Sequence, residues 1–233
     1  MNMVEHPILF YVFGIPVHDT VLYTWITMGI ILLTALLLKA FKPDFLELAL
    51  EAVISVVDDA MDVDDLHQYI PLLGSLMIFV LFSNLISLFP VLKAPTADLK
   101  TAIGISLIVV LSVHFFGMAK KGVWKYLKEF ASPVILLPIE IIGQLSRTLS
   151  LSMRLFGNIL SSDMIVAIVF SIIPFLVPIA FTALSIFSSV LQAYVITTLA
   201  ALFISSAVEI NEEDKSVRAA KPLRNKRGRR SKA

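Results

Sequence analysis

The chain has 233 residues, of which 58% are hydrophobic and only 16% are charged, and its mean hydropathy is +0.87. Because about a quarter of the residues in a soluble domain are charged, this composition excludes an ordinary soluble fold and favours a polytopic membrane protein. The net charge of +1 hides an uneven distribution of charged residues along the chain, since nine of the 19 basic residues lie in the last 19 positions. The absence of cysteine excludes a disulfide framework and a thiolate metal site.

Long apolar runs locate the membrane helices, since about 20 apolar residues cross the hydrocarbon core of a bilayer. No basic residue precedes Lys39, so the first run is interpreted as a retained span and not as a secretory signal peptide. The expected fold is all-α, with a membrane domain over residues 1–209 and a basic, disordered cytoplasmic tail over residues 210–233. Five membrane helices are expected, at about residues 20–40, 70–92, 101–119, 134–173 and 178–208.

A further helix, expected at about residues 44–65, is amphipathic and lies at the inner surface. Five of its acidic residues fall within about 60° of one another at 100° per residue; they are Glu47, Glu51, Asp58, Asp62 and Asp65. Anionic lipid would repel this face. It is therefore either a merely solvated surface or a contact for a basic protein partner.

The basic residues of the short loops predict the orientation of the chain, because such residues gather on the cytoplasmic side. The segment before the first span has none, which places the N-terminus outside. Lys39 and Lys42 follow that span on the inside, and four lysines follow the third span, also on the inside. The alternation ends with a cytoplasmic C-terminus.

The fourth span is too long to cross the membrane upright. A helix over residues 134–173 would measure about 60 Å, about twice the hydrocarbon thickness. It must tilt steeply, break or protrude. Pro174 and Pro178 end it and start the last helix, which predicts a hairpin that turns on the outer side.

A polar seam follows one face of this fourth span. Glu140, Arg147 and Arg154 are spaced seven residues apart, and Gln144 and Asn158 each lie one turn further along. Arg147 is open to two interpretations, a side chain that reaches the headgroups or half of a structural ion pair. Arg154 is central, and none of its neighbours one turn away is acidic. Its partner is therefore expected on another element or another chain.

The chemistry of the seam narrows its role. Arginine keeps its proton in proteins, so Arg154 can attract a carboxylate and repel a cation but cannot carry protons. Glu140, Asp163 and His114 can titrate, and so can relay protons. Two carboxylates at opposite depths with a fixed positive charge between them suggest two half-channels separated by a barrier.

The stretch "LSLSMRLFGNILSSDMIV" resembles the a subunit of the F-type ATP synthase, whose essential arginine lies in RLFGN. Weaker similarities are "PTADL" before the third span, "KKGVWKYLKEF" after it, and "LQAYVITTLAALFISSAVE" in the last helix. The resemblance covers roughly residues 20 to 209. It implies a bacterial plasma-membrane stator subunit whose last two helices form a long, tilted hairpin against a ring of c subunits.

The resemblance also implies roles for individual residues. Arg154 would face the ring carboxylates, with Asn158 and Gln192 as polar neighbours. Glu140 would belong to the inner half-channel, and Asp163 to the outer one. The remaining candidates for ion translocation are Asp98 of the outer loop, Arg147 and Gln144. The implied partners are the c ring, the b subunits of the peripheral stalk and membrane lipid, without cofactor, metal or nucleic acid.

One position departs from the family pattern. Many relatives carry an ionisable residue of the outer channel seven residues before Gln192, where this chain has Ser185. Asp163 would then act there with water and hydroxyl groups. His114 either compensates for the missing group or is a polar residue packed between helices.

The main alternative is a secondary transporter that uses Glu140, Arg154 and Asp163 for coupling. Such a fold favours paired repeats with broken helices in both halves, and only one break is evident. No GxxxxGK[ST] loop occurs, so the chain is not expected to bind nucleotide or to be an enzyme by itself. The coupling ion, either the proton or Na⁺, depends largely on the ring carboxylate of another chain.

Overall fold

The computed structural model describes residues 8–12, 15–61, 63, 65–88, 92–130, 137–172 and 177–219. It is an all-α fold with five helices long and apolar enough to cross a membrane, as the sequence predicts. Residues 210–219 of the expected disordered tail are helical, and the rest of that tail lies outside the described residues. A short antiparallel hairpin, β1 (Ile8–Val12) and β2 (Ile15–His18), precedes the first helix. It was not predicted.

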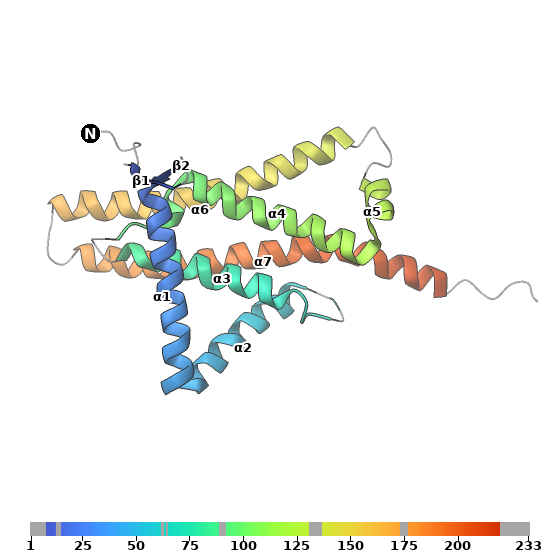
Figure 1. The fold of residues 1–233 in the computed structure, drawn as a ribbon, viewed down its shortest axis with the longest axis horizontal. Coiled ribbons are helices and arrows are strands. Elements are labelled where there is room, and N and C mark those ends of the chain that lie inside the picture. Colours follow the sequence, from blue (N-terminus) through green and yellow to red (C-terminus); the bar gives the residue numbers. More distant parts are fainter. Residues whose placement is uncertain are drawn as a thin grey trace, which may run out of the picture.

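The five apolar helices are α1 (Asp19–Phe41), α3 (Ile70–Leu85), α4 (Leu99–Lys121), α6 (Leu137–Ile172) and α7 (Val177–Ala219). Short 3-10 turns, η1 (Ile86–Leu88) and η2 (Pro95–Ala97), connect α3 to α4. Figure 1 shows α6 and α7 running side by side and crossing the direction of α1 steeply. With 36 and 43 residues, they are about 54 and 64 Å long, so both exceed the thickness of a bilayer core.

The amphipathic helix α2 (Pro43–Ala60) is shorter than expected. Pro43 starts it. Proline is favourable there, because the first N–H groups of a helix have no acceptor within the helix. It ends five residues early, with Met61 in extended backbone and no basic residue in its last turn. The aspartates gathered here oppose the negative end of the helix dipole, which explains why the helix does not reach Asp65.

A short helix that was not predicted, α5 (Val123–Phe130), follows α4 directly. Gly122, with φ 82°, makes the turn between them, and its N–H donates to the Met118 carbonyl oxygen. A positive φ is a conformation that glycine adopts at little cost. The chain thereby folds back so that α5 packs on the end of α4.

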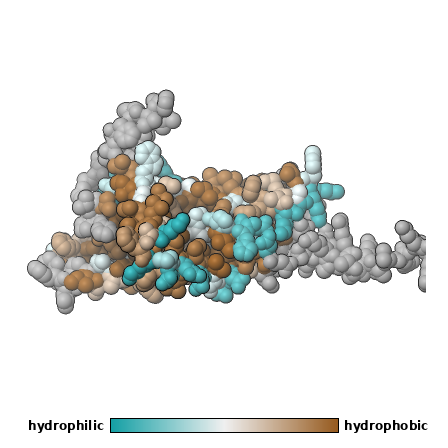
Figure 2. Space-filling view, turned by 60° about the horizontal axis from the view of Figure 1, so that its bottom comes forward, coloured by the Kyte–Doolittle hydropathy of each residue, from teal (hydrophilic) through white to brown (hydrophobic). Residues whose placement is uncertain are grey.

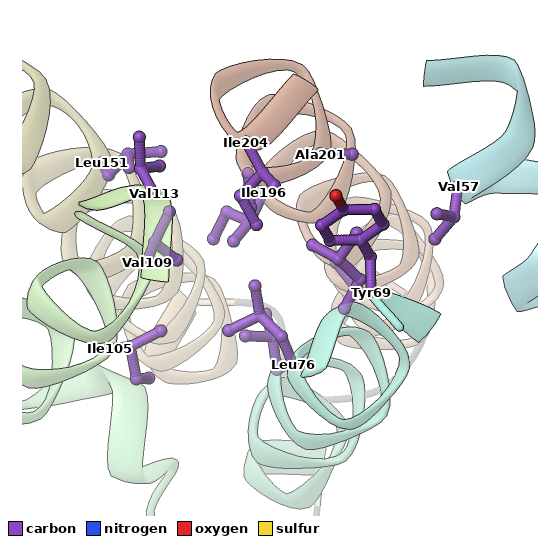
Figure 3. Close-up of a cluster of buried hydrophobic side chains, with 14 of the residues drawn as sticks. Val57, Tyr69, Leu76, Ile105, Val109, Val113, Leu151, Ile196, Ala201 and Ile204 are labelled. Carbon is purple, nitrogen blue, oxygen red and sulfur yellow. The ribbon is translucent and has the colours of Figure 1, made fainter. Parts of the chain in front are cut away.

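The apolar core lies where α3, α4, α6 and α7 meet, with α2 packed at one end. Figure 3 shows side chains from these helices converging on one interior, among them Val109 of α4, Leu151 of α6 and Ile204 of α7. The outer surface is also rich in apolar side chains, and Figure 2 shows them beside patches of hydrophilic ones. An apolar exterior of this kind suits lipid as the solvent.

Candidate ion-translocation site

Arg154 lies on the exposed face of α6. Its neighbours Ser152 and Leu155 are fully buried in the bundle, so the helix turns its opposite side, with Arg154, away from the core. Within the described part of the chain, no carboxylate forms an ion pair with its guanidinium and no hydrogen bond to it is found. The absence of an acidic partner on α6 was predicted, and the other described helices supply none either.

Asn158, one turn beyond Arg154, makes a polar contact between α6 and α7. The Ser188 hydroxyl of α7 donates to Asn158 Oδ1 at 2.8 Å. Gln192 lies one turn after Ser188, is 6% exposed, and its Nε2 has no hydrogen-bond partner. Burying an amide donor without an acceptor costs free energy. We therefore expect a water molecule or another polar group to accept from Gln192 Nε2.

A cavity of about 690 Å³ lies between α6, α7, η1 and the segment that contains Leu92 and Lys93. Asp163 and Ser185, expected together on the outer side, both line it, and Thr182 adds a hydroxyl group. The cavity also contains a basic group that sequence reasoning missed, Lys93, whose Nζ is 3.7 Å from a carboxylate oxygen of Asp19.

Asp98 does not line this cavity. Its carboxylate accepts the backbone N–H of Lys100 at 3.1 Å and caps the start of α4. It lines a separate pocket of about 230 Å³ between α1 and α4, together with Thr20 and Thr24. The structure therefore brings Asp163 and Ser185 together and leaves Asp98 apart from them.

At the other end of the seam, the polar side chains contact other side chains of the same chain. Gln144 Nε2 donates to Glu140 Oε1 at 3.0 Å. The Arg147 guanidinium lies over the Phe203 ring of α7, 4.0 Å from its centroid, a distance at which a cation and an aromatic face attract each other. Arg147 and Arg154 follow the same seven-residue spacing, but their surroundings differ: Arg147 lies over an aromatic ring, and Arg154 is exposed.

His114 packs between helices, one of the two interpretations left open by the sequence. Its Nδ1 is 2.7 Å from the hydroxyl oxygen of Tyr126 on α5. Sequence reasoning missed Tyr126, because the contact exists only through the sharp turn at Gly122.

Comparison with known proteins decides the family. Residues 21–205 match the family described as ATP synthase A chain. The chain belongs to this family. It is similar to ATP synthase subunit a 2 of Picosynechococcus sp., with 32% identity over 93% of this chain and 97% of that protein. It is also similar to ATP synthase subunit a 2 of Bradyrhizobium sp., with 38% identity over 86% of this chain and 93% of that protein. ATP synthase subunit a of Legionella pneumophila (strain Corby) shares 36% identity over 85% of this chain and 90% of its own length. These comparisons lend no support to the secondary-transporter alternative.

Proposed function

We propose that this chain is the proton-translocating stator subunit in the membrane sector of an ATP synthase. In this proposal it carries protons through two half-channels to and from the carboxylates of a ring of c subunits. It binds no nucleotide and catalyses no reaction by itself. The b subunits of a peripheral stalk hold it against the rotating ring, in a bacterial plasma membrane with the N-terminus outside. The observation that carries the proposal is the charge of Arg154 on the exposed face of α6, which has no ion-pair partner among the described residues.

A ring carboxylate is the partner that Arg154 requires. A charged side chain at the centre of a membrane costs at least about 2.5–3.5 kcal/mol, and the described helices provide no carboxylate that would offset this cost. A carboxylate that reaches Arg154 is favoured in its ionised form and gives up its proton. Because arginine keeps its own proton, Arg154 separates the two half-channels without conducting between them.

The cavity beside Asp163 is the proposed outer half-channel. Asp163 is nine residues after Arg154, which is about 13 Å along the helix. A carboxylate with hydroxyl groups and water can pass protons over such a distance. Ser185 supplies a hydroxyl group of this kind, although its own proton is already donated to the Phe181 carbonyl oxygen.

The proposed inner half-channel begins at Glu140 on the other side of Arg154. The hydrogen bond from Gln144 holds the Glu140 side chain along α6, and the stacking of Arg147 on Phe203 fixes this end of α6 to α7. Between the two half-channels, Arg154 and the Asn158–Ser188 hydrogen bond form the barrier.

The proposal is tested by replacing Arg154 with alanine in the whole ATP synthase. We expect Arg154→Ala to abolish ATP synthesis driven by a proton gradient while the complex still assembles, because the ring carboxylates lose their counter-charge. Leu36→Ala is a suitable control, since Leu36 is exposed on α1 away from the seam. Coupled synthesis that persists in an assembled Arg154→Ala complex would remove the proposal.

A further inference from the structure

Lys93 places a positive charge in the cavity that also contains Asp163, and the proposed half-channels do not use this charge. The Lys93 side chain is 68% exposed, and its backbone is held in place on both sides. Its neighbours Leu92 and Ala94 pack in a small apolar cluster that also contains Ile159 of α6. The lysine is therefore fixed at the wall of the cavity, with its charged end in the open space.

Asp19 holds the ammonium group of Lys93 from outside the cavity. A carboxylate oxygen of Asp19 lies 3.7 Å from Lys93 Nζ, whereas Asp19 itself is buried and does not line the cavity. Its other oxygen accepts the backbone N–H of Thr20 at 2.9 Å, in the first turn of α1. The positive end of a helix dipole favours a negative charge there. The Asp19 charge is thus shared between α1 and Lys93, and the positive end of the ion pair faces the cavity.

The same cavity offers oxygen atoms of the kind that metal cations bind. Beside the Asp163 carboxylate, it is lined by the hydroxyl groups of Ser87, Thr182 and Ser185. Ca²⁺ and other hard cations prefer carboxylate and neutral oxygen ligands. A cation attracted to ionised Asp163 would occupy the place at which this carboxylate takes up a proton, and it would therefore block proton entry.

The charge of Lys93 opposes such binding. Asp163 and Lys93 are the charged residues among those described at the cavity wall, so an ionised Asp163 leaves the wall with no net charge. Charges in a partly enclosed site are screened less than charges at an open surface, and a fixed positive charge is an electrostatic barrier to a cation. A proton differs from a metal cation because it forms a covalent O–H bond with the carboxylate. Its uptake therefore does not require a cavity with a net negative charge.

We propose that Lys93 excludes metal cations from the Asp163 cavity and thereby keeps this entrance open to protons. The inference rests on the proposed function, in which Asp163 takes up protons from the outer side. Asp19 is a positioning residue that restrains the Lys93 side chain, whereas the exclusion itself depends on the charge of the lysine.

The test uses liposomes that contain the whole ATP synthase with its nucleotide-binding sector on the outside, so that the lumen faces the proposed outer half-channel. A potassium diffusion potential drives ATP synthesis, and the lumen contains either calcium chloride or choline chloride at equal ionic strength. Each variant is described by its rate with calcium divided by its rate with choline. This ratio corrects for differences in assembly and in basal activity between the variants.

We expect calcium to leave the rate unchanged for the unmodified complex and for Lys93→Arg, which keeps the charge. Calcium should lower the rate several-fold for Lys93→Gln, because Ca²⁺ then reaches Asp163. Asp19→Asn breaks the same ion pair but keeps the positive charge, so it should remain insensitive to calcium. Lys100→Gln removes a lysine from the separate pocket beside Asp98 and should also remain insensitive.

A rate of Lys93→Gln that calcium does not lower would overturn the inference. So would a calcium block in Asp19→Asn as strong as that in Lys93→Gln, because the effect would then come from the broken ion pair and not from the lost charge. The choline series tests the proposed function separately: synthesis that persists there in Arg154→Ala refutes the proposed function itself.

Discussion

The two arginines of α6 show how little a residue's type says about its role. Arg147 lies 4.0 Å from the centroid of the Phe203 ring and is therefore tied to α7. Arg154, two turns later, is exposed and has no charged partner among the described residues. The first contact stabilises the packing of two helices. The second side chain retains its capacity to attract a carboxylate from another chain.

Asp163 is the residue on which entry from the outer side is proposed to depend. Asp163→Asn should slow passive proton flux through the membrane sector strongly, because the amide cannot take up and release a proton at this position. Asp163→Glu keeps the carboxylate in the same cavity and should retain much of the flux. Equal flux in the Asn variant and the unmodified protein would place the outer half-channel elsewhere.

At the scale of elements, small side chains allow α4, α6 and α7 to approach closely. Ser152 on α6 and Ala200 and Ala201 on α7 are all fully buried. In lipid, close contact of this kind is a main source of association between helices. The face opposite this contact is the one that carries Arg154, so the packing determines where the charge points.

Enlarging one of these contacts should disturb the bundle. Ala200→Leu adds three carbon atoms at a fully buried side chain. Overpacking of a core typically lowers the free energy of unfolding by about 1–3 kcal/mol. We expect a lower melting temperature and less assembled complex. Ala183→Leu makes the same change at an exposed position of α7 and should alter neither. An Ala200→Leu protein as stable as the Ala183→Leu protein would contradict the packing described here.

The elements were predictable where the hydropathy of the sequence determines them. Apolar runs of sufficient length located all five membrane helices, including the fourth, which carries four charged side chains. The end of α2 was not predicted, because periodicity reports a face but not the repulsion between clustered aspartates and the end of a helix. The helix α5 has only eight residues, too few for a periodic pattern, and its place depends on the backbone turn at Gly122.

At the scale of the whole molecule, the long pair α6 and α7 presents an exposed polar seam within an apolar exterior. Arg154 lies near the middle of α6, between Glu140 toward one end and the Asp163 cavity toward the other. Helices of this length spread these groups over a distance greater than an upright span provides. This is the arrangement that the two proposed half-channels require.

The parts of the site that lie on one helix were predictable, since seven-residue spacing determines which side chains share a face. The contacts between helices were not. Nothing in the sequence pairs Ser188 with Asn158, Phe203 with Arg147, or Lys93 with the Asp163 cavity, because these contacts depend on how α6, α7 and the segment between η1 and η2 pack.

The most direct test of the central claim is cysteine cross-linking between α6 and the membrane helix of a c subunit in the assembled ATP synthase. The chain contains no cysteine, so single introduced thiols report one position each. Ser150 and Ser161 are exposed on α6 on either side of Arg154, whereas Leu151 is 3% exposed and provides a matched buried control. We predict cross-links from Ser150→Cys and Ser161→Cys but not from Leu151→Cys. An assembled complex in which neither exposed position cross-links to the c subunit would contradict the claim that Arg154 faces the ring.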